Sequence, residues 1–392
     1  MAQQSAWAWP EAGAEAAAPT VAQWPLAAGA LAVAGPCMWL AAHAAASPAD
    51  QTPAYAAVFV ILAGWAAAIG RRGIAVRLPL LCWFALVWPL VGLAPLPRML
   101  LARIDPQRAA ELAEFVRAGI TSPPTISLYP YATARALLMV AASVALFTLA
   151  RGLGSRSIAA LQWMAGAVLV MALAEALPAL RQHAMLATGA ARPLQPGGDF
   201  IHGTFGNRNL LAAWLEGCYG VALAVFVAGT GQRRDGGPSV AGLNVFAGVA
   251  ALASATAILC SFSRMGVVTL ALETVLVGWL LWGGGWRARL AAAALVLGAA
   301  ACLLVAGAPG FAGRYSAASL AAEKEGRLAM WADAVRAMRR YPLLGSGAGT
   351  FAFAFRRSHP YLTGYTIDHA HCEYLETAVE WGIPAVVLLA AL

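Results

Sequence analysis

The sequence predicts an all-α membrane protein that crosses the bilayer many times. Of its 392 residues, 61% are hydrophobic and 11% are charged, whereas soluble domains are roughly 45–50% apolar and about 25% charged. The mean hydropathy is +0.69. Apolar runs of about 20 residues, the length that an α-helix needs to cross roughly 30 Å of hydrocarbon, recur along the chain.

Ten such runs are expected to form transmembrane helices. They begin near Gln23, Ala54, Leu78, Tyr131, Ile158, Leu210, Val240, Met265, Leu290 and Thr377. The first run does not read as a signal peptide, because the leader at 1–20 has no Lys or Arg and carries Glu11 and Glu15. The tenth run is still apolar at Leu392, so we expect the natural protein to continue.

Arginines in four short connections set the expected orientation, since short loops rich in Arg and Lys stay in the cytoplasm. All of them lie between an even-numbered span and the next odd one: Arg71, Arg72, Arg77, Arg151, Arg156, Arg233, Arg234, Arg287 and Arg289. The chain then divides into a transmembrane bundle at 1–308 with a cytoplasmic N-terminus, a large helical loop at 309–376 on the opposite face, and the start of span ten at 377–392.

The net charge of +8 does not indicate nucleic-acid binding. The basic residues, of which Lys324 is the only Lys, stand in short groups between apolar runs instead of forming one stripe. Five of the 6 cysteines fall in apolar runs, and Cys372 has no partner nearby in the sequence, so neither a disulfide framework nor a zinc site is expected.

Polar residues concentrate first at 202–209, just before span six. Asn207 and Asn209 are typical helix N-caps, and a helix N-terminus next to Arg208 favours an anion. A plain helix cap explains the same pattern. Glu216, two turns into the span, is expected to be paired, neutral or functional, because an unpaired carboxylate in a membrane is costly.

The second concentration is Ser263-Arg264, in a very short connection between spans seven and eight. Arg264 is either a side chain that reaches from the span to the membrane interface or a ligand for a lipid phosphate.

The third concentration lies in the long loop. The segment 324–341 predicts an amphipathic helix that carries Arg327 and ends before Pro342, with Leu328, Trp331, Val335 and Met338 on one stripe. The small-residue loop 345–350 follows, and its backbone N–H groups, including that of Gly347, could cradle phosphate oxygens. It is not a P-loop, because the Lys and Ser/Thr of that motif are missing.

The fourth concentration is 368–376, at the start of the tenth run. His369 and His371 are two residues apart and would point to different sides of a helix, so we expect no metal site. The crowding of Asp, His and Glu at a membrane boundary favours a functional role, while capping or packing is the alternative.

These four places, taken in order, resemble the O-antigen ligase and O-antigen polymerase superfamily. The resemblance covers roughly residue 201 to the end. Two positions depart from the family pattern, namely Cys372 where Asn is usual and Ala385 where Gly is frequent. The matching stretches are 203–209, Ser263-Arg264, Arg327 with Trp331, 342–347, 369–371, 374–376 and 382–384.

The resemblance implies a glycosyltransferase of the GT-C type in the bacterial inner membrane, with its active site facing the periplasm. Its donor would be a polysaccharide on undecaprenyl diphosphate. Ligases of this family transfer the glycan to lipid A–core, and polymerases transfer it to a second lipid-linked glycan. Family ligases have twelve spans and a large periplasmic loop between spans nine and ten, which fits 309–376 and two further spans after Leu392.

We therefore expect an inverting, metal-independent transferase without a cofactor, with ligation to lipid A–core as the leading reaction and O-antigen or exopolysaccharide polymerisation as the alternative. Arg264 and Arg327 are assigned to the departing diphosphate and His371 to the general base, with His369 as second candidate. Substrate binding is expected from His369, Asn207, Arg208, Asn209, Gly347 and Glu216.

Two other classes of protein fit part of the pattern. A transporter or flippase for a bulky anion explains many spans and outward-facing arginines, but such proteins often show internal repeats and broken helices at mid-membrane. The polar clusters here sit at one edge, and no repeat between the halves is visible. A structural component of a polysaccharide assembly complex is the remaining possibility.

Overall fold

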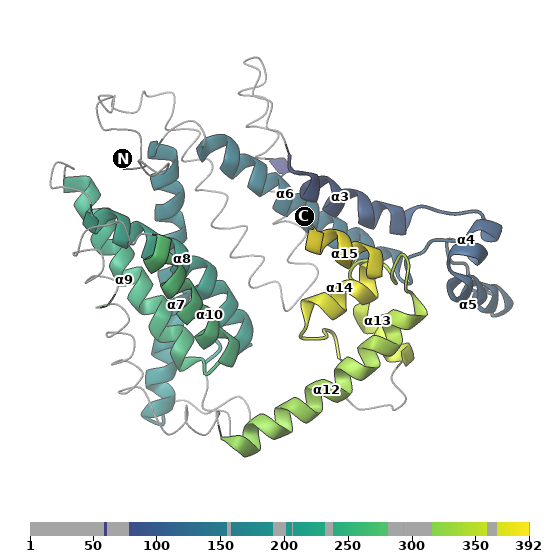
Figure 1. Cartoon of the computed structure of the whole chain (residues 1–392). Helices are drawn as coiled ribbons and strands as arrows, with labels where there is room; N and C mark the ends of the chain where they lie inside the picture. The colour runs from purple at the N-terminus through teal and green to yellow at the C-terminus, as the bar shows by residue number, and fades with distance from the viewer. Residues whose placement is uncertain are drawn as a thin grey trace, which may run out of the picture.

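The computed structural model describes residues 59–60, 78–154, 158–190, 201–205, 207–231, 238–280, 293, 316–358 and 367–391. Within these residues every regular element is a helix (Figure 1), which confirms the predicted fold class. Four of the described helices are long and apolar enough to cross a membrane. These are α6 (Pro130–Gly154), α7 (Ile158–Ala187), α8 (Arg208–Gly231) and α9 (Pro238–Cys260).

Other expected spans are shorter in the structure or lie outside its described part. The run from Leu78 forms α3 (Leu80–Leu93), whose 14 residues reach only about 21 Å. The run from Met265 forms α10 (Arg264–Leu280). The runs from Gln23, Ala54 and Leu290 lie almost entirely outside the described residues. The count of ten spans therefore stays a prediction.

Helices α7 to α10 pack side by side as one bundle (Figure 1), and small residues line its core. Ala176 and Ala222 are fully buried there. A methyl group added at Gly266 of α10 would lie 3.0 Å from the Cβ of Ala212 on α8. Small residues suit a membrane bundle. In lipid there is no hydrophobic driving force for helix association, so the helices are stabilised by close van der Waals packing instead.

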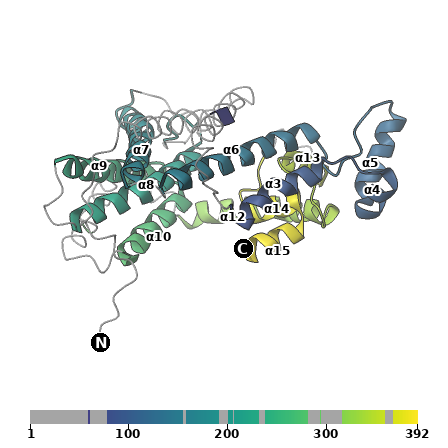
Figure 2. The same cartoon turned by 90° about the horizontal axis from the view of Figure 1, so that it is seen from above.

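The remaining helices form a second group. Figures 1 and 2 both place α3 alongside α6, and α4 (Arg98–Ile104) and α5 (Pro106–Arg117) follow α3. The corner between α4 and α5 is fixed by Asp105, whose Oδ1 accepts the Arg108 N–H at 2.9 Å, and by Pro106 in the first turn of α5.

Helix α12 (Ala317–Arg340) ends before Pro342, as the sequence predicts. Its buried face differs from the predicted stripe. Ala334 and Ala337 are fully buried and Tyr341 continues this face, whereas Leu328 is 50% exposed. The prediction was wrong for Leu328. The contact of α12 with its neighbours is made by the small alanines, which allow a closer approach than a bulky residue. The packing partners are α13 (Phe351–Ser358) and α14 (Glu373–Trp381).

The tenth apolar run is two helices, α14 and α15 (Ile383–Ala391), with Gly382 between them. Gly382 has a φ of +83°, and a Cβ there would overlap the carbonyl of Leu343. The Ile383 N–H donates to the Pro342 carbonyl at 2.9 Å. The helix breaks here because the backbone of the turn after α12 is packed against it.

Gly345 offers a test of this contact. It has a φ of +73°, and a Cβ there would overlap the carbonyl of Glu380 in α14. Gly345→Ala should lower the free energy of unfolding by roughly 2–4 kcal/mol, through left-handed strain plus overpacking. Gly119→Ala is the matched control, because Gly119 has the same φ of +73° but no atom within 4 Å of the added Cβ. Thermal unfolding in detergent measures both variants, and equal losses would contradict the packing argument.

Candidate functional site

The starts of α8 and α10 meet at one point. The Ser263 hydroxyl donates to Asn209 Oδ1 at 3.0 Å, which links the residue before α10 to the first turn of α8. Ser263 Oγ also accepts the Gly266 N–H at 3.4 Å and so caps α10. Asn207 Oδ1 accepts the Asn209 N–H at 2.8 Å and caps α8, as the sequence predicts.

This junction is electropositive. Arg208 and Arg264 are the first residues of α8 and α10, and both side chains are half-buried. Each helix N-terminus adds roughly half a positive charge. Two helix starts with two guanidinium groups suit an anion with several oxygens, such as a phosphate or diphosphate.

The segment before α8 is hydrogen-bonded to α7 through residues that are not among the predicted site residues. Gln182 Oε1 accepts the N–H groups of His202 and Gly203, each at 3.1 Å. The Thr204 hydroxyl donates to Glu175 Oε2 at 2.6 Å. Glu175 is only 2% exposed. The sequence signal that could have identified Glu175 is its place inside an apolar run, because a carboxylate in such a run needs a partner.

Glu216 lies in a polar contact between α8 and α10. Its carboxylate is hydrogen-bonded to Thr269, and Glu273 is near enough to repel it. One helical turn further, the hydroxyls of Tyr219 and Thr274 are 2.8 Å apart. Thr269 therefore gives Glu216 a hydrogen-bonding partner. Its assignment to substrate binding stays a prediction.

The histidine segment, residues 369–371, is held by hydrogen bonds to two helices. His369 Nδ1 lies 2.7 Å from Glu376 Oε1, and the Ala370 N–H donates to Glu376 Oε2 at 3.0 Å. The Trp331 indole N–H donates to the Ala370 carbonyl at 3.0 Å. These bonds connect the segment to α14 through Glu376 and to α12 through Trp331.

The two histidines differ in their surroundings. The hydrogen bond that Glu376 accepts is the main cause that raises the pKa of His369, against the opposing effect of burial. His371 is exposed and has a φ of +50°, in the left-handed region that residues other than Gly seldom adopt. Such backbone strain is frequent at functional sites, where the surrounding structure holds it in place.

Arg327 belongs with the histidines. It is half-buried on α12, four residues before Trp331, and residues at this spacing share a helix face. Arg327 therefore lies on the face of α12 whose next turn contacts the histidine segment. The structure thus assembles the candidates as two groups, one at the starts of α8 and α10 and one between α12 and α14.

The two groups belong to different helix clusters. In Figure 1, α12 runs from the lower end of the α7–α10 bundle towards the α13–α15 cluster. Arg327 is in the first half of this helix, so α12 is the element that leads from one group to the other. Whether the groups act on one substrate stays a prediction.

The glycine-rich loop binds a carboxylate of its own chain. Glu380 Oε2 and Oε1 accept the N–H groups of Gly349 and Phe351, each at 2.8 Å. The Gly347 N–H donates to the Glu380 carbonyl at 2.9 Å. In this structure the N–H groups of the loop are therefore bonded to Glu380 of the same chain. The assignment of Gly347 to substrate stays a prediction.

A second network was not anticipated. Glu111 on α5 accepts the Tyr341 hydroxyl at 2.9 Å and pairs with Arg357 at 2.6 Å and Arg108 at 3.4 Å. Arg108 is fully buried and also donates to the Thr125 carbonyl at 3.0 Å. Burial and the Glu111 charge raise the pKa of Tyr341 to about 12, so its hydroxyl stays a donor. The network joins α5, α12 and α13.

Among the described residues, no three His, Cys, Asp or Glu side chains are grouped closely enough to hold a metal ion.

Comparison with known proteins supports the resemblance seen in the sequence. Residues 249–390 match the model of the O-antigen ligase family, and this range contains Arg264, Arg327, His369 and His371. No curated protein and no solved structure matches the chain. The matched range and the four motifs support a resemblance to the O-antigen ligase family over the second half of the chain.

Proposed function

We propose that the protein transfers a polysaccharide from undecaprenyl diphosphate to lipid A–core on the periplasmic face of the bacterial inner membrane. The family match supports an O-antigen ligase type of activity. The observation that carries the proposal is the junction at Asn209 and Ser263, where two helix N-termini and Arg264 lie together at one end of the α7–α10 bundle.

A diphosphate is the group that this junction fits. In the proposed reaction the bond between the anomeric carbon and the diphosphate oxygen breaks, and negative charge grows on the departing diphosphate. Arg264 and the two helix starts stabilise that charge where it develops, and Arg327 supplies a second guanidinium from α12. The leaving group is already activated, so the reaction needs neither a nucleotide nor a redox cofactor.

The acceptor hydroxyl needs a base, and the two histidines have different roles in the proposed reaction. His369, with its pKa raised by Glu376, is held towards the protonated form, which binds a negative group but cannot accept a proton. We assign the base to His371, because its side chain is exposed and open to an acceptor hydroxyl. In the proposed step the acceptor oxygen attacks the anomeric carbon with inversion and its proton passes to His371.

Polymerisation is the closest alternative, because ligase and polymerase share the donor and differ only in the acceptor. A transporter is disfavoured, because the family match covers the Arg264 and His371 regions and indicates transfer chemistry.

The function is tested by the lipopolysaccharide ladder of a deletion strain. Loss of a ligase should remove all O-antigen from the core and leave long glycan on the polyprenyl carrier. The purified full chain should transfer lipid-linked glycan to lipid A–core without ATP and in the presence of a chelator. Core that carries a single repeat in the deletion strain would instead identify a polymerase, and a need for added metal would overturn the arginine mechanism.

Arg264→Lys should lower turnover by about ten-fold or more, because Lys keeps the charge but loses the planar fork that holds two phosphate oxygens. Arg117→Lys is the matched control, since the Arg117 side chain is 76% exposed on α5. Transfer rates are compared in membranes with equal protein levels. Wild-type turnover in Arg264→Lys would mean that the residue is only an interfacial anchor.

His371→Gln should lower turnover by ~10²–10⁴-fold, the usual contribution of a positioned general base, with donor binding retained. His369→Gln should act mainly on KM, because it removes a positive charge that is not the proton acceptor. Because Glu376 raises the pKa of His369, donor binding should weaken as the pH rises through that pKa, and this weakening should vanish in His369→Gln. Near-native turnover in His371→Gln would reject the base assignment.

A further inference from the structure

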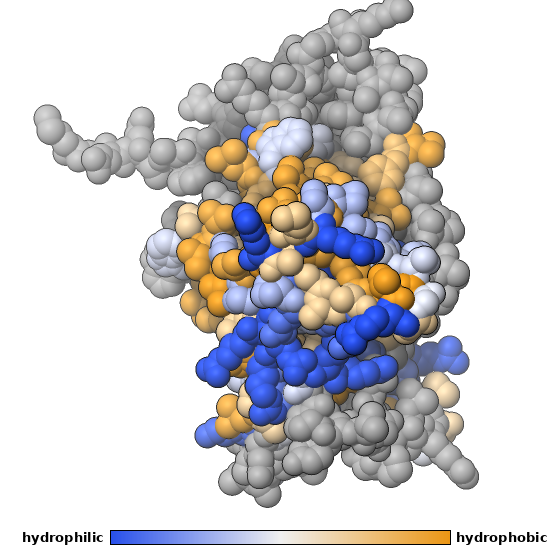
Figure 3. Space-filling model, turned by 90° about the vertical axis from the view of Figure 1, so that its right-hand side faces the viewer, coloured by the Kyte–Doolittle hydropathy of each residue, from blue (hydrophilic) through white to orange (hydrophobic). Residues whose placement is uncertain are grey.

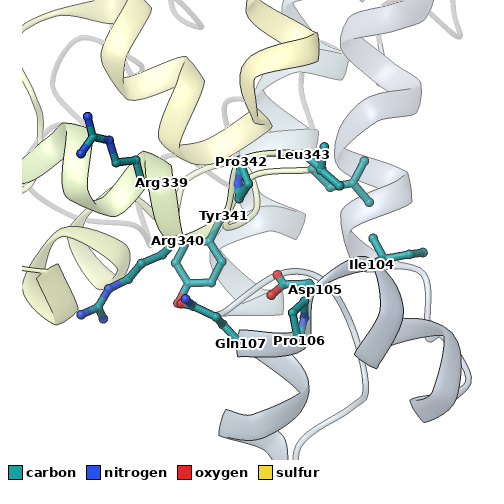
Figure 4. Close-up of a pocket in the computed structure, with 10 residues that line it drawn as sticks. Ile104, Asp105, Pro106, Gln107, Arg339, Arg340, Tyr341, Pro342 and Leu343 are labelled. Carbon is teal, nitrogen blue, oxygen red and sulfur yellow. The ribbon is translucent and has the colours of Figure 1, made fainter.

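The strongest unassigned feature is a cleft between the α4–α5 corner and the end of α12. Its volume is about 330 Å³, within the usual range of ligand pockets of about 300–1,000 Å³. The walls come from two parts of the chain that are far apart in sequence, 104–107 and 339–344 (Figure 4). We propose that this cleft binds a saccharide unit that carries a phosphate or carboxylate substituent.

The floor of the cleft supplies hydrogen-bonding groups. The Asp105 carboxylate is 8% exposed and is held in place by the Arg108 N–H. In Figure 4, Gln107 reaches towards the Tyr341 hydroxyl, and the Asp105 carboxylate lies between Tyr341 and Pro106. A carboxylate and an amide together accept and donate to neighbouring hydroxyls, which is the pattern a sugar ring offers.

The other walls are apolar. Ile104, Pro342, Leu343 and Leu344 line the cleft and present carbon atoms to its interior. A sugar ring has an apolar C–H face as well as a hydroxyl edge. The apolar walls can therefore contact the C–H face while the polar floor binds the hydroxyls. A bare phosphate ion would leave the apolar walls unused and would be repelled by Asp105.

The rim adds positive charge. Arg339 and Arg340 form the last turn of α12, and both are exposed. Figure 4 shows both side chains extending outward, away from Asp105 and Leu343, so a charged substituent would meet them outside the cleft. They partly offset the negative end of the helix dipole. Planar guanidinium groups also match the oxygens of a phosphate or carboxylate, which sets the charge of the expected ligand.

The cleft is preorganised by the network around Glu111. The Tyr341 hydroxyl donates to Glu111, and Arg357 from α13 pairs with the same carboxylate. The wall from α12 is thereby fixed to α5, whose first turn carries Gln107. Figure 3 faces the side of the molecule where α4 and α5 lie and shows hydrophilic side chains gathered there in a broad band. A polar ligand can therefore approach the cleft over a polar surface.

This proposal rests on the geometry of the cleft and is independent of the transfer reaction. The purified full chain is titrated with glucose 1-phosphate, glucuronic acid, glucose, glycerol 1-phosphate and inorganic phosphate, and binding is followed by saturation-transfer NMR and calorimetry. The two charged sugars should bind about ten-fold or more tightly than glucose and than the two phosphates without a sugar ring.

The double variant Arg339→Gln/Arg340→Gln should lose that preference for charged sugars, and Gln107→Trp should block all sugar binding by filling the cleft. Arg117→Gln is the matched control, because Arg117 is exposed at the far end of α5 and should leave binding unchanged. Unfolding temperatures verify that each variant is folded.

Three results would overturn the proposal. Equal binding of glycerol 1-phosphate and glucose 1-phosphate would mean that the site recognises a phosphate of any source, such as a lipid headgroup. Equal losses in Arg117→Gln and in the double variant would indicate general surface charge. Unchanged binding in the folded Gln107→Trp variant would place the ligand elsewhere.

Discussion

Glu380 occupies the centre of the hydrogen-bonded contact between the glycine-rich loop and α14. Its two carboxylate oxygens hold the N–H groups of Gly349 and Phe351, and its carbonyl holds that of Gly347. The loop can approach so closely because Gly345 and Gly382 leave no Cβ between the two backbones. The start of α13 and the position of α14 both depend on this contact.

The position of the histidine segment depends on the same contact. Once α14 is fixed, Glu376 is placed to hold His369 and the Ala370 N–H, and α12 is placed to reach the segment through Trp331. The strained backbone of His371 lies between these anchors. Anchors on both sides limit the movement of the backbone that carries His371, which suits the proton acceptor proposed above.

The proposed reaction and the proposed sugar cleft use different parts of α12. Arg327, in its first half, belongs to the candidate transfer site, whereas Arg339 and Arg340 stand at the rim of the cleft at its end. The Glu111 network fixes the end of α12 to α5 and α13. Since both sets of arginines lie on one helix, α12 keeps them at a constant spacing.

The sequence by itself determined the helical membrane character, the starts of four long spans and of α10, the Asn207 cap and the end of α12 before Pro342. These depend on composition and on neighbours a few residues apart, which local chemistry specifies. It also ordered the four motifs, three of which lie in the range that matches the O-antigen ligase family.

Only the tertiary structure placed Gln182, Glu175, Arg108 and Glu380, since each is explained by a partner on a distant segment. It also put alanines instead of Leu328 on the buried face of α12 and divided the tenth run at Gly382. Buried polar groups must find partners and close backbones must exclude Cβ atoms, and both conditions are set by segments that meet only when the chain has folded.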